Sequence, residues 1–266
     1  MHKEIIHFSH ANGFPAKSYS VLFNHLATQF DVGYIDRIAH DPGYPVTDNW
    51  PHLVEELIRY IEHHYHQPII AVGHSMGGVL SYMVSLKRPD LFKGFIMLDA
   101  PVLLGIDAHV IGLSKHLGLI DRVTPAGRTV GRCESWPNKQ AAIDYFKHKS
   151  LFKYTDARCL NDYVEYGTEP CDDGIRLRFK SETEIKLYRT LPHTLGRGST
   201  KAAIPGAFIY GQQSKVVWPY QVRMMRQKAG VYTTSTVGSH LFPMEHPEKT
   251  AHAIARVVEK LSQWNQ

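Results

Sequence analysis

The chain has 266 residues, of which 43% are hydrophobic and 21% are charged, which is typical of a globular protein with one large domain or a core and a lid. It has no apolar run long enough for a membrane-spanning helix, no signal-peptide core at its start, and three cysteines without metal-ligand spacing, so we expect a cytoplasmic protein without an integral membrane segment. The net charge of +5 is spread without a Lys/Arg cluster, which argues against nucleic acid as a partner.

Apolar runs and amphipathic segments alternate along the first 100 residues. Strands are predicted near 5–8, 32–35, 69–72 and 95–98, and helices near 17–29, 49–65 and 76–88. The same alternation resumes after residue 203, with strands predicted at 207–210 and 231–237 and helices at 219–228 and from His246 onward. Strands that alternate with helices predict a parallel sheet with helices on both faces.

Residues 101–203 interrupt this alternation. The segment is mildly basic, with 16 Lys and Arg residues against 12 Asp and Glu residues. We expect helices and one short strand in it, at Ala108–Leu119, Asn138–Phe146, Thr155–Glu165, a strand at Arg176–Phe179, and a helix from Ser181, where Ser181 and Glu184 have capping-box spacing. A long insertion after a strand end normally lies over the mouth of the sheet, where binding sites form.

A serine stands between a predicted strand and a predicted helix, in the sequence Gly73-His74-Ser75-Met76-Gly77. A sharp turn of this kind exposes a serine hydroxyl to a base, and glycines on both sides allow other backbone to approach closely. The next residue, Met76, opens the helix, so its free N–H could stabilise an oxyanion. The alternative interpretation is an ordinary strand-to-helix turn without chemistry.

With this motif in this context, the sequence resembles the α/β-hydrolase superfamily. The resemblance implies a core at 1–100 and 204–266 and a largely helical cap at 101–203, inserted before the penultimate strand. Only two strands precede the strand before Ser75, so we expect a six-stranded, mostly parallel sheet with strand order 2-1-3-4-5-6 along the chain.

The resemblance also implies a base and an acid. The superfamily's histidine lies in a turn after the last strand, where His240 stands in Gly238-Ser239-His240. The usual place of the acid holds Ser214, and residues 205–244 contain no Asp or Glu. We therefore predict Asp99, at the end of the strand after the serine helix, as the acid that orients His240, with a cap carboxylate such as Asp107 or Asp121 as the alternative.

The second oxyanion donor is expected in the turn after the first strand. Asn12-Gly13-Phe14-Pro15 resembles a family motif there, which implies the N–H of Phe14 as the donor opposite that of Met76. We expect structural roles for His10, Asn12 and His74.

These residues predict a serine hydrolase that cleaves a carboxylic ester or related acyl compound through an acyl-enzyme, without a cofactor. A metal site is not expected, because His63, His64 and His66 have no acidic partners nearby in the sequence. Thioester hydrolysis, C–C bond hydrolysis and acyl transfer stay open, because the same triad serves them. A small-molecule receptor on a hydrolase scaffold is the alternative from another class, and multiple turnover would distinguish the enzyme from it.

Overall fold

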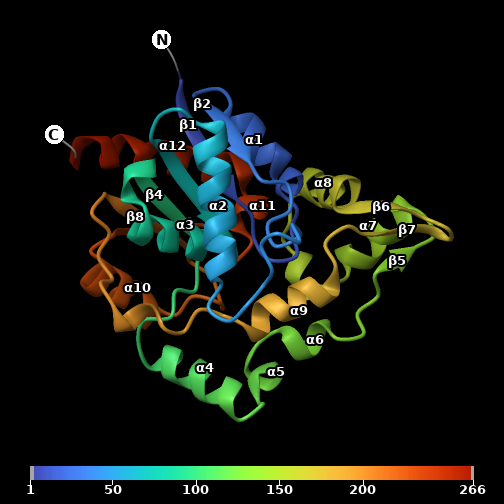
Figure 1. Ribbon diagram of the computed structural model, residues 1–266. Helices are drawn as coiled ribbons and strands as arrows, with labels where there is room; N and C mark the ends of the chain where they lie inside the picture. Colours follow the sequence, from blue (N-terminus) through green and yellow to red (C-terminus); the bar gives the residue numbers. More distant parts are fainter. Residues whose placement is uncertain (1–2, 265–266) are drawn as a thin grey trace.

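The computed structural model describes residues 3–264, and its main feature is a six-stranded sheet in which all strands are parallel (Figure 1). The strands are β1 (Glu4–Ser9), β2 (Phe30–Tyr34), β3 (Ile69–His74), β4 (Phe92–Leu98), β8 (Gly206–Gly211) and β9 (Tyr232–Thr236). Their order is β2-β1-β3-β4-β8-β9, and each neighbouring pair is parallel. The predicted six-stranded parallel sheet with order 2-1-3-4-5-6 is confirmed.

Helices cover both faces of this sheet (Figure 1). They are η1 (Ala16–Tyr19), α1 (Ser20–Leu26), α2 (Pro51–His64), α3 (Met76–Lys87), η2 (Pro89–Leu91), α10 (Pro219–Met224) with its π-helical continuation η5 (Met225–Ala229), α11 (Phe242–Glu245) and α12 (Pro247–Trp264). Helices α1 and α12 pack on one face, and α2 and α3 pack on the other.

Strand β3 shows why its sequence is apolar throughout. Successive side chains of a strand point to opposite faces, and here both faces are covered. Ile70 and Val72 pack on the side of α1 and α12, whereas Ile69 and Ala71 pack on the side of α2 and α3. All six residues of β3 are buried, so its C-terminal end, where Ser75 follows, is held from both sides.

The segment between β4 and β8 contains short helices and a second, small sheet at one end of the main sheet (Figure 1). Its elements are α4 (Ile106–His116), α5 (Ile120–Val123), α6 (Ala126–Thr129), β5 (Ser135–Trp136), α7 (Lys139–Lys147), η3 (Ser150–Phe152), α8 (Ala157–Gly167), β6 (Thr168–Cys171), β7 (Gly174–Leu177), α9 (Ser181–Arg189) and η4 (Leu195–Arg197). The predicted helices correspond to α4, α7, α8 and α9, and the predicted strand overlaps β7. The antiparallel sheet β5-β7-β6 was not predicted, because its strands are only two to four residues long.

The predicted capping box at Ser181 is wrong. Lys180 is the N-cap residue of α9, and no side chain caps this end. The N–H of Ser181 donates instead to Glu134 Oε1 at 3.1 Å, and Glu184 pairs with Arg132, with Nη2 and Oε2 2.7 Å apart. The carboxylate of Glu134, which is distant in the sequence, therefore accepts a hydrogen bond at this helix end in place of a local capping side chain. Within residues 3–264, no helix is both long and apolar enough to cross a membrane.

Candidate active site

Ser75 occupies a strained backbone position between β3 and α3. Its φ of 51° and ψ of −114° lie in a region that side chains with a Cβ rarely adopt. The N–H of Ser75 donates to the carbonyl of Leu98 at 2.9 Å, which ties the turn to the end of β4. A Cβ on Gly77 would stand 2.0 Å from the carbonyl oxygen of Ser9, so only glycine allows α3 to start this close to β1.

Asp99 lies at the end of β4, next to this turn, and its side chain is fully buried. Its N–H donates to the carbonyl of Ile209 at 2.8 Å, and its φ of 45° is a second strained position at this edge of the sheet. Asp99 Oδ2 is 2.7 Å from Nδ1 of His240, which follows β9. The predicted contact between Asp99 and His240 is therefore present.

Two further donors hold the Asp99 carboxylate. The N–H of Gly211 donates to Oδ1 at 2.9 Å, and the hydroxyl of Ser214 donates to Oδ2 at 2.5 Å. Ser214 thus supports the carboxylate from the position where a carboxylate usually stands. An ionised carboxylate can only accept hydrogen bonds, so a neutral His240 ring in this contact carries its proton on Nδ1 and leaves the lone pair of Nε2 free.

The turn after β1 does not support the expected role of Phe14. The N–H of Phe14 donates to the carbonyl of Ala11 at 3.1 Å and closes a turn in which Gly13 has a φ of 83°. This amide is already used, so it does not face Ser75 as a free donor. In contrast, Asn12 lines the same pocket as Ser75 and Met76, and among residues 3–264 no partner is found for the N–H groups of Asn12 and Met76.

A chain of buried hydrogen bonds connects this turn to the loop of His240. Burial holds the pKa of His74 well below its usual value, so the ring is neutral. His74 Nε2 lies 2.8 Å from the carbonyl of His240 and must donate to it, so Nδ1 accepts from the hydroxyl of Tyr19 at 2.7 Å. The Tyr19 oxygen in turn accepts the N–H of Ala11 at 3.4 Å. His74 has the expected structural role, but Tyr19 carries no sequence signal and was missed.

His10 is fixed in a similar way. The N–H of Ile38 donates to Nε2 at 2.8 Å, so Nδ1 carries the proton and donates to the carbonyl of Ala11 at 2.8 Å. Burial lowers the pKa of His10 to about 4, which keeps the ring neutral. The expected structural role of His10 fits these bonds.

The pocket beside Ser75 has a volume of about 50 Å³ and a mainly apolar lining. Side chains from the core and from the segment after β4 contribute to it: Asn12, Trp50, Ser75, Met76, Val79, Pro101, Leu103, Tyr188, Leu191 and Pro192. None of these residues is charged. The segment between β4 and β8 therefore supplies half of the residues that line the pocket beside Ser75.

Comparisons with known proteins identify the fold family. A model of the alpha/beta hydrolase family matches residues 8–253. The chain belongs to this family. A solved structure of E-2-(acetamidomethylene)succinate hydrolase superposes with a TM-score of 0.77 at 18% identity, covering 97% of this chain and 92% of that one. The thioesterase domain from the curacin biosynthetic pathway superposes with a TM-score of 0.73 at 17% identity, covering 95% and 91%.

Curated relatives of this hydrolase are similar in sequence at a low level. The type I acyl-CoA thioesterase mpaH of Penicillium roqueforti (strain FM164) is 24% identical over 174 residues, which are 59% of this chain and 38% of that protein. The monoglyceride lipase of Mus musculus is 25% identical over 195 residues, which are 71% of this chain and 57% of that protein. The chain thus spans well under two thirds of these relatives' length.

Glu184, in the segment after β4, contacts the turn that contains Asn12. The side-chain amide of Asn12 donates to the carbonyl of Glu184 at 3.1 Å, and a Cβ on Gly13 would lie 3.1 Å from Glu184 Oε2. Glu184 is buried and pairs with the guanidinium of Arg132 through both carboxylate oxygens, at 2.7 and 3.2 Å. The sequence did not predict the contact between Asn12 and Glu184, because these residues are 172 positions apart.

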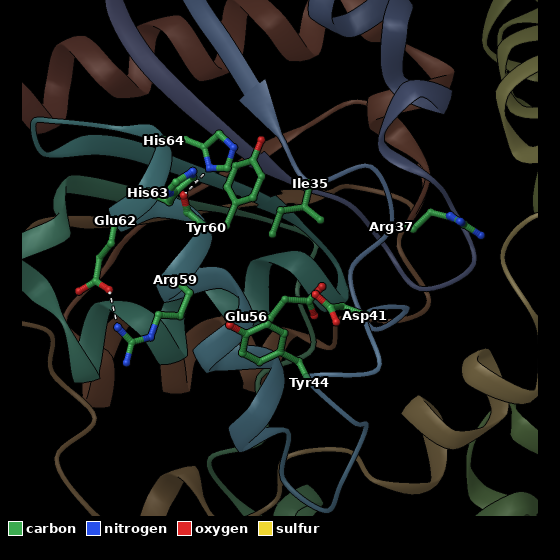
Figure 2. A pocket seen from close by; sticks show the side chains of 10 residues that line it. All are labelled: Ile35, Arg37, Asp41, Tyr44, Glu56, Arg59, Tyr60, Glu62, His63 and His64. Atoms are coloured by element: carbon green, nitrogen blue, oxygen red, sulfur yellow. Dashed lines mark hydrogen bonds and ion pairs between the residues drawn. The ribbon is translucent and has the colours of Figure 1, made fainter.

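A second cavity of about 700 Å³ lies apart from Ser75, between the end of β2 and α2 (Figure 2). Most of its lining residues are polar or charged, and Figure 2 shows Arg59 directed toward Glu62 and the rings of Tyr60 and His64 side by side. Glu56 is a largely buried residue of this lining and accepts the N–H of Ala39 at 3.1 Å; burial raises the pKa of its carboxyl to about 7. None of the predicted site residues lines this cavity.

The described part of the chain, residues 3–264, contains no group of three or more His, Cys, Asp or Glu side chains placed to hold a metal ion.

Proposed function

We propose that this α/β hydrolase is a serine hydrolase that cleaves an ester or thioester of an uncharged, apolar acyl group. The observation that carries the proposal is the 2.7 Å contact between Asp99 and His240 at the strand ends that also hold Ser75. Two strained residues, Ser75 and Asp99, stand side by side at this edge, and strain of this kind is concentrated at functional sites.

In the proposed mechanism, Nε2 of His240 takes the hydroxyl proton of Ser75 as Oγ attacks the carbonyl carbon of the substrate. Asp99 keeps the proton of His240 on Nδ1 and stabilises the imidazolium that forms. His240 then gives the proton to the leaving group, and an acyl-enzyme remains on Ser75. Water, activated by the same histidine, releases the acid product.

The oxyanion of the tetrahedral intermediate would accept hydrogen bonds from the N–H groups of Met76 and Asn12. Both residues line the pocket and their N–H groups lack partners among residues 3–264, whereas the N–H of Phe14 is used within its turn. The N-terminal end of α3 adds the positive end of its dipole at Met76. Donors that are already in position need no rearrangement when the charge develops.

The lining of the pocket indicates the substrate class. Trp50, Val79, Leu103 and Leu191 offer apolar contacts, and no basic side chain is present to bind a carboxylate on the acyl group. We propose that residues 101–203 act as a cap that selects this group. The volume of about 50 Å³ suits a short chain in this conformation, so a longer acyl chain requires α4 or α9 to move.

A panel of p-nitrophenyl esters from acetate to decanoate tests the proposal, with p-nitrophenyl hemisuccinate as the charged comparison. The expected result is multiple turnover on the uncharged esters, at least tenfold lower kcat/KM on the hemisuccinate, and no turnover with Ser75→Ala. A single stoichiometric burst without turnover would favour a receptor, and equal turnover by Ser75→Ala would contradict the proposal.

A further inference from the structure

Helix α4 presents an apolar stripe to solvent. Ile106, Val110 and Leu113 of the helix, with Leu117 at its C-cap, recur at intervals of three and four residues, which places them on one side of the helix. Their exposed fractions are 74%, 48%, 59% and 56%. A surface helix normally turns its apolar side toward the core, so an outward stripe of this extent indicates a binding surface.

The opposite side of α4 is packed normally. Ala108 and Ile111 are buried against Leu103 and Leu191, which line the Ser75 pocket. The apolar stripe is therefore additional to the apolar side that anchors the helix. Anything that binds the stripe contacts the element lying directly over the pocket wall.

Exposed aromatic residues extend the surface at the N-terminal end of α4. Asp107 Oδ2 accepts a hydrogen bond from Gln221 at 2.9 Å, which places the start of α10 beside this end. Trp218 and Tyr220, from the same region, are 61% and 40% exposed. Trp and Tyr are enriched where proteins meet the interfacial region of membranes, because their rings are apolar at one end and polar at the other.

The charges around the stripe favour an anionic partner. Asp107 and Asp121 are the acidic residues of α4 and α5; Asp121 is paired with Arg189, whereas Asp107, at the end of α4 remote from α5 in the chain, accepts a hydrogen bond from the neutral Gln221 and keeps its charge. Arg122 is exposed between the apolar residues Leu119 and Val123, and it has no acidic partner among residues 3–264. The whole segment 101–203 carries 16 basic and 12 acidic residues.

We propose that the outward stripe of α4, together with Trp218, Tyr220 and Arg122, docks the protein on an anionic lipid surface. Apolar side chains that enter the acyl boundary and a basic residue among the headgroups are the two contributions that bind interfacial helices. This inference extends the proposed function, since it brings the pocket of Ser75 to a surface that holds acyl esters, but docking does not require catalysis.

The test uses the full chain with Ser75→Ala, so that binding is measured without hydrolysis. Flotation with vesicles of phosphatidylcholine and phosphatidylglycerol (3:1) is compared with vesicles of phosphatidylcholine alone. We expect co-flotation with the anionic vesicles that weakens at 0.5 M salt. Leu113→Ser should weaken binding about tenfold, because one buried leucine side chain is lost from the interface.

Leu151→Ser is the matched control, because Leu151 is 48% exposed, like Val110, but lies in η3, between α7 and α8. It should change binding less than twofold. Absence of co-flotation, or equal loss in both variants, would overturn the proposal. A dimer that is seen in sedimentation velocity and that Leu113→Ser dissociates would also overturn the proposal, because the stripe would then bind a second copy of the chain. Hydrolysis of p-nitrophenyl acetate, measured with Ser75 present, reports separately on the proposed function.

Discussion

Replacing Asp99 with Asn should lower kcat by a factor on the order of 10⁴ and leave the fold nearly unchanged. The carboxylate accepts three hydrogen bonds in this structure, from Gly211, Ser214 and His240. An asparagine side chain offers one accepting oxygen and one donating nitrogen, so it cannot accept at both positions.

Neither orientation of the asparagine side chain reproduces the hydrogen bonds that the carboxylate accepts. If its nitrogen takes the place of Oδ2, it donates to Nδ1 of His240 and moves the ring proton to Nε2, which then cannot accept from Ser75. If its oxygen takes that place, the nitrogen faces the N–H of Gly211, and two donors oppose each other in a buried site. The equivalent change in a serine protease costs about 10⁴ in kcat, or about 5.5 kcal/mol in the barrier.

The assay is the steady-state hydrolysis of p-nitrophenyl butyrate, with circular dichroism to verify folding. Ser214→Ala is the matched control, since it removes one donor to the same carboxylate and keeps its charge; we expect about a tenfold loss. Full activity of Asp99→Asn, or equal losses in the two variants, would refute the assignment of Asp99 and direct attention to a carboxylate of the segment 101–203.

Two further predictions concern buried groups. Tyr19→Phe should lower the free energy of unfolding by about 2–3 kcal/mol in urea titrations, because Nδ1 of His74 and the N–H of Ala11 lose their partner inside the protein; an unchanged midpoint would show that these bonds do not matter. Glu56→Gln should stabilise the protein by about 2 kcal/mol at pH 8 and by much less at pH 4.5. Burial raises the pKa of the Glu56 carboxyl to about 7 in the folded state, whereas in the unfolded state this carboxyl loses its proton near pH 4.5. The stability that protonated Glu56 contributes is therefore lost as the pH rises from 4.5 through 7. Equal effects of Glu56→Gln at both pH values would contradict this.

The sequence was sufficient for features that depend on local patterns. The Ser75 turn follows from an apolar run, a pair of glycines around the serine and apolar residues at helical spacing after it, all within about 20 residues. The contact between Asp99 and His240 could be predicted because residues 205–244 contain no carboxylate, which left few acids able to reach His240. The structure adds that Ser214 donates to Asp99.

Features that depend on how distant segments meet could not be predicted in this way. In the turn after β1, the N–H of Phe14 is not free, because it donates a hydrogen bond to the carbonyl of Ala11. The sequence motif alone does not show that hydrogen bond. The contact of Glu184 with Asn12 joins residues 172 positions apart, and the spacing suggested a local helix cap instead. The outward stripe of α4 has the spacing of an ordinary buried face, so exposure was decided only by the packing of Ala108 and Ile111.

Labelling with a fluorophosphonate probe, followed by peptide mapping by mass spectrometry, tests the central claim most directly. The probe reacts with a serine hydroxyl only when a base and an oxyanion site activate it. The proposed function predicts stoichiometric modification of Ser75, loss of esterase activity in parallel, and no labelling of Ser75→Ala. Modification of another serine, with Ser75 unlabelled in an active preparation, would contradict it.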